Sequence, residues 1–490
     1  METITDLLTR ADTFRRAHVR QGYQRGIGSL QETVPAPQED EWLTRETILA
    51  LRSLLRTAEP ALQLGIRHLL RFLSTAYLSR NVQELSDALQ LQQAAAMIHV
   101  PVLEGPVPLW QVAGRMARER KRVTRELLEE ATTTVIRELN TPYGELWSRL
   151  NTVSEDLGYP SLLALWEEIS GVPLDDLLKP LDAILRETDD TYRDLMDWHL
   201  KRSLGITLQT ARRHDILALM HPGERDAWFP AATLLPTLER WLSEWGWSVT
   251  ENTNLHIERH PEVAAGALCA PVDIPEHVYL ALAPTGGVSG FAHALRETGK
   301  ALLYASLPGD APPELRCFPD PSLLEAQAEI CEGLLRDQHW VEIYRHIQPS
   351  EEALRLAHLE RLFIVRRYIG KCFYERALYE NTTLDEKRES YGDALRRACG
   401  FGYPDAYFLH DVEPGFATLW RVRGWVLSAH IRCQLQRQYD VEWFRERDAL
   451  QALRTLWHQS PPYPLEAILQ RVGGTPMDVA PVAADLLSAL

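Results

Sequence analysis

Helical amphipathic spacing runs through most of this chain of 490 residues, and it restricts the fold to one built mainly from packed helices. Apolar residues recur at three- and four-residue intervals in four early stretches: Glu41–Thr57, Leu62–Leu78, Val82–Ile98 and Leu109–Leu139. The same texture resumes at about residue 290 and continues to residue 490. We therefore predict a mostly α fold.

One stretch, at about 245–285, departs from the helical texture. The segments WGWSVTENTNLHIERHP, GALCAPVDIP and HVYLALAP are short, partly alternating and bounded by Pro and Gly, which predicts two to four strands. The turn Thr285-Gly286-Gly287 then leads into a helix at about 290–306. We expect a helical domain over 1–205 and a second domain over 206–490. The second would place a small antiparallel or mixed sheet beside that helix, followed by further helices.

Charge and cysteine usage exclude several classes of function. The net charge of −16 argues against binding to nucleic acid or to an anionic membrane surface. No run of about eighteen apolar residues is present to span a bilayer. The six cysteines form no CxxC pair, so a thiolate zinc site is not expected. The first residues, METITDLLTR, lack an apolar core of a signal peptide, and with reduced thiols they predict a cytoplasmic protein.

The helix at about 290–306 carries part of a zinc-hydrolase pattern. Such a site uses two histidines at i and i+4, a glutamate directly after the first histidine as general base, and a third ligand from a later helix. Here Arg296-Glu297-Thr298-Gly299-Lys300 has the glutamate in place, but Arg296 and Lys300 occupy the two histidine positions. Leu324-Glu325-Ala326 places a carboxylate 25 residues after Lys300.

These motifs resemble those of the zinc endopeptidases of the thimet oligopeptidase and oligoendopeptidase F kind. The run Gly299–Tyr304 is similar to that family's Gly-His-Ala-Leu-His-Tyr, and Glu325 falls where the family's second helix supplies its glutamate ligand. The strand and Gly-Gly turn before the helix also match the order of elements in the family. The resemblance covers residues from about 206 to the end, and it implies a zincin-like peptidase fold with Glu297 at the general-base position.

The departures from the family remove the chemistry that the resemblance would imply. Arginine has no lone pair to offer a metal, and lysine must first lose its proton. The family also uses tyrosines on a late helix to stabilise the tetrahedral intermediate, and Ala417 and Arg421 stand at those positions, with His410 slightly out of register. We hypothesise that an ion-pair cluster replaces the metal, with Arg296 or Lys300 paired to Glu325.

A rebuilt metal site remains as an alternative. His293 precedes Glu297 by one helical turn, so His293, Glu297 and Glu325 are a conceivable ligand set. The plainer interpretation is that His293 lines the cleft near the start of the helix. Other candidate cleft residues, which the resemblance places near the site, are Gly286, Gly287, Tyr304, His410 and Arg421.

The sequence favours a pseudopeptidase over an enzyme. We predict a peptidase-like protein without zinc or another cofactor, which binds a peptide or a protein partner; the strand before the motif helix offers an edge for an extended peptide. The alternatives are an active zinc-dependent oligopeptidase built on His293, Glu297 and Glu325, and a helical interaction scaffold. Neither the partner nor the oligomeric state follows from the sequence.

Overall fold

The structure, a computed structural model, describes residues 4–29, 42–221, 223–248, 252–264, 266–380, 383–458, 465–474, 478–488 and 490. The predicted helix start at Glu41 and residues 249–251 and 265 of the expected sheet region lie outside these ranges. The chain packs as two compact units. Unit 1 contains 1–73, 222–354 and 423–482, and unit 2 contains 74–221, 355–422 and 483–490. The expected domains, 1–205 and 206–490, are consecutive stretches of sequence, whereas each unit combines three separate stretches. The domain boundary near residue 205 stays a prediction.

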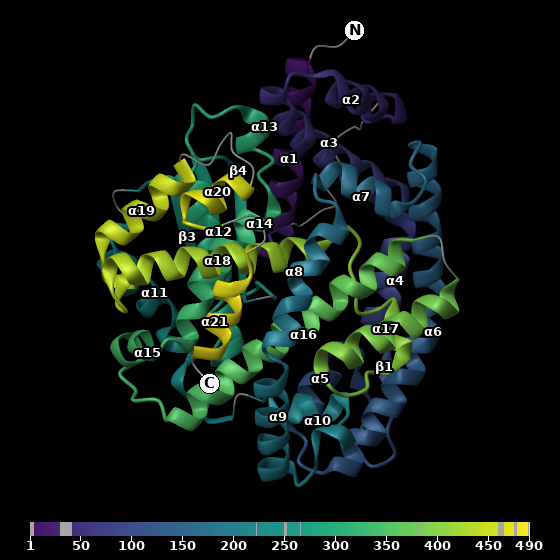
Figure 1. Cartoon of the computed structure of the whole chain (residues 1–490), viewed down its shortest axis with the longest axis vertical. Helices are drawn as coiled ribbons and strands as arrows, with labels where there is room; N and C mark the ends of the chain where they lie inside the picture. Colours follow the sequence, from purple (N-terminus) through teal and green to yellow (C-terminus); the bar gives the residue numbers. More distant parts are fainter. Residues whose placement is uncertain are drawn as a thin grey trace. The chain divides into compact units, whose positions relative to one another are not determined.

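Helices dominate both units (Figure 1). Those lying wholly in unit 1 are α1 (Ile4–Gly26), α2 (Arg45–Thr57), α11 (Leu234–Trp245), α12 (Gly287–Ser306), α13 (Pro313–Arg316), α14 (Pro321–Glu332), α15 (Gln338–Arg345), α19 (Arg447–His458) and α20 (Leu465–Arg471). Those lying wholly in unit 2 are α4 (Gln83–Ala95), α5 (Leu109–Arg118), α6 (Arg122–Asp156), α7 (Leu162–Ser170), α8 (Leu174–Glu187), α9 (Asp189–Leu204), α10 (Arg213–Leu219) and α17 (Leu384–Cys399). Four helices contain a boundary between the units: α3 (Pro60–Asn81), α16 (Glu351–Tyr379), α18 (Ala417–Tyr439) and α21 (Ala480–Ser488).

The expected single helix over Leu109–Leu139 is instead two helices, α5 and α6. The chain between them is extended at Glu119 and Lys121. Buried Arg125 explains this break, because its guanidinium Nη1 donates to the carbonyls of Glu119 and Arg120 at 3.0 and 3.1 Å. The side chain therefore satisfies carbonyls that a continuous helix would have paired internally.

The small sheet of unit 1 is mixed. Strand β5 (His277–Leu282) lies between β3 (Leu255–Arg259), to which it is parallel, and β4 (Ala267–Asp273), to which it is antiparallel. Helix α12 packs on this sheet, and the prediction of a mostly α fold with a small sheet beside the motif helix is confirmed. Unit 2 contains a two-residue ladder between β1 (Met97–Ile98) and β2 (Val107–Pro108).

Local sequence explains where helix α17 begins and ends. At the start of α17, the Thr383 side chain accepts from the Glu386 N–H while the Glu386 carboxylate accepts from the Thr383 N–H, a reciprocal capping box. The helix ends before Gly400, whose φ of +79° is a left-handed conformation that glycine adopts without strain.

The core of unit 1 is rich in tryptophan, and Trp241 and Trp245 of α11 stack with centroids 5.2 Å apart.

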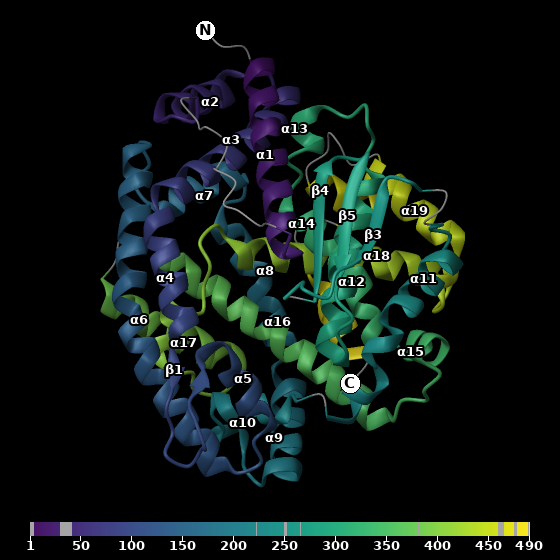
Figure 2. The same cartoon turned by 180° about the vertical axis from the view of Figure 1, so that it is seen from behind.

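The described residues before position 74 pack against the rest of unit 1, in part through a buried arginine. Helix α1 lies along β4, as Figure 2 shows. Arg71 of α3 donates to the carbonyls of Phe318 and Pro319, just before α14 begins, at 2.8 and 2.7 Å. Burial lowers the pKa of Arg71 to about 10, so it keeps its charge at neutral pH. Next to it, Arg423 of α18 is 3.4 Å from Asp320.

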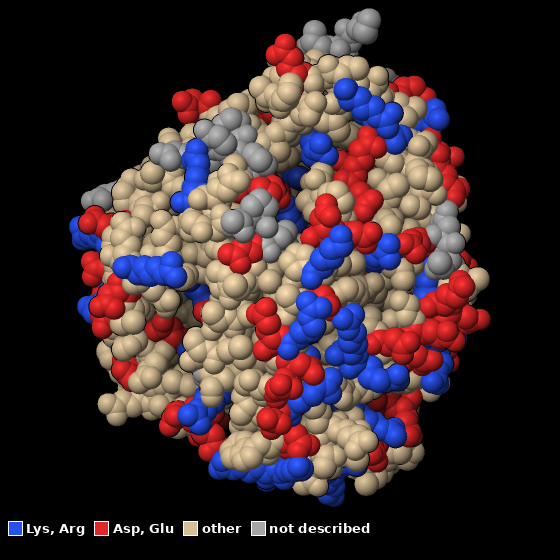
Figure 3. All heavy atoms as spheres, in the orientation of Figure 1, with Lys and Arg blue, Asp and Glu red and all other residues tan. Residues whose placement is uncertain are grey.

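Among the described residues, no helix is both long and apolar enough to cross a membrane. On the face shown in Figure 3, basic and acidic side chains are interspersed. All six cysteines are free thiols.

Candidate functional site

The glycine pair before α12 permits a close approach of backbone to backbone. Gly287 has a φ of +78°, and its N–H donates to the Phe229 carbonyl at 2.8 Å. A Cβ at Gly286 would lie 2.8 Å from the Ala231 nitrogen, and one at Gly287 would lie 2.8 Å from Asp226 Oδ1. These two predicted cleft residues therefore fix the start of the helix against the 226–231 segment.

Two further glycines bring α14 against the motif helix. A Cβ at Gly299 of α12 would lie 2.5 Å from the Gln327 carbonyl oxygen, and one at Gly424 of α18 would lie 2.6 Å from the Cβ of Glu325. Contacts this short leave no room for a side chain, so α14 packs directly on both neighbouring backbones. This packing holds Glu325 opposite Arg296.

Arg296 forms a fork between two carboxylates of α14. Its Nη2 is 2.6 Å from Glu325 Oε2, and its Nη1 is 2.8 Å from Glu332 Oε2. The three side chains are 19%, 15% and 21% exposed, so water screens them only partly. Burial opposes the charge of Arg296, but Glu332 and Glu325 outweigh burial and raise its pKa. The pair hypothesised from the sequence is thus present, with Arg296 rather than Lys300 bound to Glu325.

Sequence reasoning missed Glu332. It lies seven residues after Glu325 on α14, which is two helical turns, so both carboxylates project from the same face. This seven-residue spacing could have identified Glu332 from the sequence. The second carboxylate supplies the other acceptor that a forked guanidinium requires.

Lys300 pairs with Glu297 on the same helix. Its Nζ is 2.7 Å from Glu297 Oε1, and Glu297 Oε2 accepts from the backbone N–H of Cys269 on β4 at 3.0 Å. Burial, with a smaller contribution from the Glu297 carboxylate, raises the pKa of the Cys269 thiol. Both oxygens of the residue at the general-base position are therefore engaged within the chain.

The outer edge of β4 is also engaged. The Cys269 N–H and the Pro271 carbonyl point away from β5, since they bond to Glu297 and to Arg15. Arg15 of α1 donates to the carbonyls of Pro271 and Val272 at 2.6 and 3.1 Å. Proline has no N–H to offer. Side chains of unit 1 thus bind the Cys269 N–H and the carbonyls of Pro271 and Val272.

The other candidate residues of unit 1 do not assemble a metal site. His293 is exposed on α12. Tyr304 has a raised pKa, caused mainly by burial and to a smaller extent by the nearby Cys269. No group of three or more His, Cys, Asp or Glu side chains positioned to share a metal ion occurs in the part of the chain that the structure describes. The alternative ligand set of His293, Glu297 and Glu325 is therefore not brought together.

The two candidate residues of unit 2 have partners of their own. The ring nitrogen Nδ1 of His410 is 3.1 Å from the Tyr143 hydroxyl, and burial lowers the pKa of His410. Arg421 donates from Nη1 to the Tyr368 hydroxyl at 2.7 Å. Both residues thus take part in side-chain networks inside unit 2.

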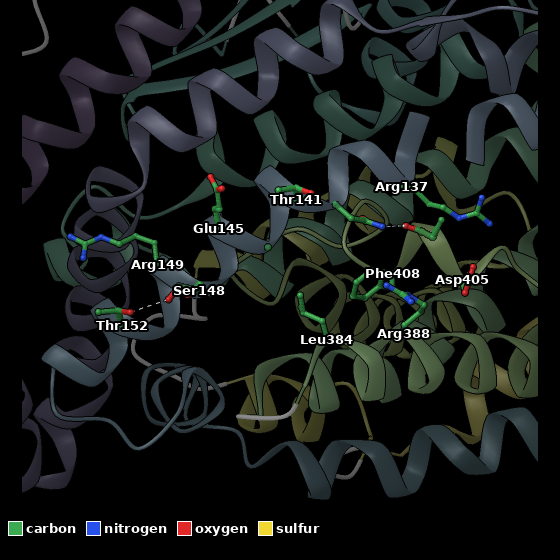
Figure 4. A pocket seen from close by; sticks show the side chains of 13 residues that line it. Arg137, Thr141, Glu145, Ser148, Arg149, Thr152, Leu384, Arg388, Asp405 and Phe408 are labelled. Carbon is green, nitrogen blue, oxygen red and sulfur yellow. Dashed lines mark hydrogen bonds between the residues drawn. The ribbon is translucent and has the colours of Figure 1, made fainter. Parts of the chain in front are cut away.

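Unit 2 also has a pocket of about 770 Å³ along α6 and the start of α17. Figure 4 shows Arg137 and Asp405 towards one end of it and Arg149 and Glu145 towards the other. Because both basic and acidic side chains line the pocket, its charge favours neither an anionic nor a cationic ligand.

The fold has counterparts among solved structures. No protein-family model matches the sequence, and the curated proteins contain no match. A structure assigned as an oligoendopeptidase F from Bacillus anthracis str. Ames aligns with a TM-score of 0.55 and 13% identity, over 98% of this chain and 84% of the other. PZ peptidase A with an inhibitor aligns with a TM-score of 0.58 and 14% identity, over 98% and 86%. The chain has the mostly helical fold of these peptidases.

Proposed function

We propose that this protein is a pseudopeptidase, in which ion pairs stand where a relative would bind catalytic zinc. The observation that carries the proposal is the fork of Arg296 between Glu325 and Glu332. Zn²⁺ would bring two positive charges to the site. Arg296 and Lys300 bring the same charge as side chains and neutralise half-buried carboxylates.

The donor set does not fit a catalytic zinc ion. A guanidinium has no lone pair for a metal, and Lys300 uses its ammonium protons to bind Glu297. Glu325 is already bound to Arg296, and a single carboxylate does not meet the three protein ligands that catalytic zinc sites use. We therefore assign no zinc-dependent step to these residues.

The occupied edge of β4 bears on what the protein binds. Strand addition needs outward-facing N–H and C=O groups on the receiving edge. Here Glu297 already binds the Cys269 N–H, and Arg15 binds the carbonyls of Pro271 and Val272. This favours a protein partner bound through another surface over an extended peptide added to β4.

The test is to restore the missing ligands. Wild-type protein expressed in zinc-rich medium should contain far less than one zinc per chain and should show no chelator-sensitive cleavage of a fluorogenic peptide. The double variant Arg296→His, Lys300→His should acquire zinc, since Glu325 would then be the third ligand. Arg296→His alone is the matched control and should not acquire it.

Two outcomes would contradict the proposal. One is near-stoichiometric zinc in the wild type that Glu325→Ala removes. The other is wild-type peptide turnover that both chelator and Glu297→Gln abolish. Failure of the folded double variant to bind zinc would instead contradict the correspondence of Arg296 and Lys300 with ligand positions.

A further inference from the structure

A carboxyl group is buried in unit 2 with only one of its oxygens hydrogen-bonded. Glu375 of α16 is 1% exposed. The Thr418 hydroxyl donates to its Oε1, whereas Oε2 has no hydrogen-bond partner within the described residues. An unpaired buried oxygen is far less favourable on a carboxylate than on a neutral carboxylic acid.

The face of α16 that carries Glu375 also holds the segment 411–418, which we call the latch segment. One turn before Glu375, Lys371 Nζ is 3.8 Å from Asp411 Oδ1. One turn after it, the Tyr379 ring stacks on Phe416 with centroids 4.6 Å apart and an interplanar angle of 11°. The latch segment is thus attached to α16 at its beginning, middle and end.

The backbone of the latch segment is constrained where α18 begins. Gly415 has a φ of +99°, and Phe416 has a φ of +60°, a region that a residue with a side chain rarely adopts. Phe416 is held there by burial and by the Tyr379 hydroxyl, which accepts from its N–H at 3.4 Å. Contacts with α16 therefore maintain a conformation that is unfavourable by itself.

The latch segment also forms part of a pocket wall. A pocket of about 620 Å³ in unit 2 is lined by residues 412–415, with Tyr143 and Trp147 of α6 among the other lining residues. Any displacement of the latch segment would change the shape of this pocket.

We propose that Glu375 is a proton-operated latch: its neutral acid form holds residues 411–418 against α16, and its ionisation loosens them. The charged groups around it act in both directions. Lys371 favours the carboxylate, whereas Asp411 and Glu413 disfavour it. Lys371 Nζ lies 3.8 Å from Asp411, whose carboxylate also binds Arg367 and the Tyr391 hydroxyl, and Lys371 makes no hydrogen bond to Glu375, so pairing it with an ionised Glu375 would require a rearrangement. The remaining titratable neighbours on α16 are Cys372, Tyr374 and Tyr379, which stay neutral because burial raises their pKa values.

The direction of the pH effect follows from linkage. Burial, above all, raises the pKa of Glu375 from an ordinary 4.5 to about 7. A group whose pKa is higher in the closed state than in the open state stabilises the closed state at low pH. This stabilisation decreases as the pH rises from the lower pKa to the higher one. The opening equilibrium of the latch segment should therefore increase about tenfold per pH unit between about 4.5 and 7, and level off above.

Hydrogen exchange of the latch-segment amides, corrected for the intrinsic pH dependence of exchange, tests this on the full-length chain. Protection should fall by roughly 40-fold from pH 5 to pH 7 in the wild type. This fall should be absent in Glu375→Gln and unchanged from wild type in Glu389→Gln, an exposed control on α17. Neighbouring His410, whose pKa burial lowers, can only add a change of the opposite sign, since its protonation at low pH opposes the closed state. Wild-type protection that does not fall with rising pH, or a fall that survives in Glu375→Gln, would overturn the proposal.

Infrared spectroscopy provides a readout that does not depend on the mutant's packing. The wild type should show the carbonyl stretch of a protonated carboxylic acid that disappears as the pH rises through about 7. Glu375→Gln should lack it. Thr418→Val removes the donor to Oε1, so the band should persist to higher pH. Absence of such a band in the wild type at pH 5 would overturn the proposal.

Discussion

Removing the charge of Arg296 should destabilise unit 1, because Glu325 and Glu332 lose the guanidinium that they share. Breaking a fully buried pair typically costs about 3–5 kcal/mol. Since Arg296 is 19% exposed and its partners 15% and 21%, screening reduces the expected loss for Arg296→Met to about 2–3 kcal/mol. Urea unfolding followed by circular dichroism and tryptophan fluorescence measures this loss.

A matched pair on the surface provides the control. Arg186 is 2.8 Å from Asp182 but is 70% exposed, so Arg186→Met should change stability by less than about 0.5 kcal/mol. Adding Glu325→Gln and Glu332→Gln to Arg296→Met should recover most of the loss, since the two carboxylate charges that Arg296 neutralised are then also removed. If Arg296→Met is no more destabilising than Arg186→Met, or if the triple variant is less stable than Arg296→Met, the ion-pair reasoning is refuted.

Four other substitutions test the packing and charge arguments. Gly299→Ala should destabilise by roughly 1–3 kcal/mol because its Cβ meets a carbonyl oxygen at 2.5 Å, whereas Gly392→Ala, with open space around it, should stabilise α17 by up to about 1 kcal/mol; opposite shifts in thermal midpoint check the pair. Arg15→Met should destabilise unit 1 by about 1–3 kcal/mol in urea unfolding, because the two carbonyls of β4 lose their donor. Burial opposes ionisation of Asp215, but neighbouring His214 and Arg125 outweigh it and lower its pKa, so Asp215→Asn should be destabilising at pH 7 and the difference should shrink as the pH falls below about 3.8. Stability curves for wild type and Asp215→Asn that stay parallel from pH 7 to pH 3 would contradict this.

Periodicity and motif order were enough to predict the fold class. Two short local patterns led us to expect that Glu325 pairs with Arg296 or Lys300, and only the structure shows that the partner is Arg296. Glu332 could have been predicted in the same way, since it shares a helix face with Glu325. It does not, however, occupy one of the family's ligand positions. For His293, helical spacing gives the direction of the side chain but not its burial, and His293 is exposed.

Contacts between distant parts of the chain were beyond local patterns. Arg15 binds a carbonyl 256 residues away, and nothing in the amphipathic pattern of α1 distinguishes it from the neighbouring arginines. The break between α5 and α6 also escaped prediction. The amphipathic spacing continues across it, and the break depends on the side chain of Arg125 taking up two backbone carbonyls.

The coverage of β4 by α1 has a consequence for biosynthesis. An uncovered strand edge readily pairs with other chains and promotes aggregation. Because Arg15 precedes Pro271 by 256 residues, α1 leaves the ribosome on the order of tens of seconds before β4 does. The helix is therefore available as soon as the strand emerges. We expect nascent chains that lack α1 to aggregate once β4 and β5 have been translated, well before synthesis is complete.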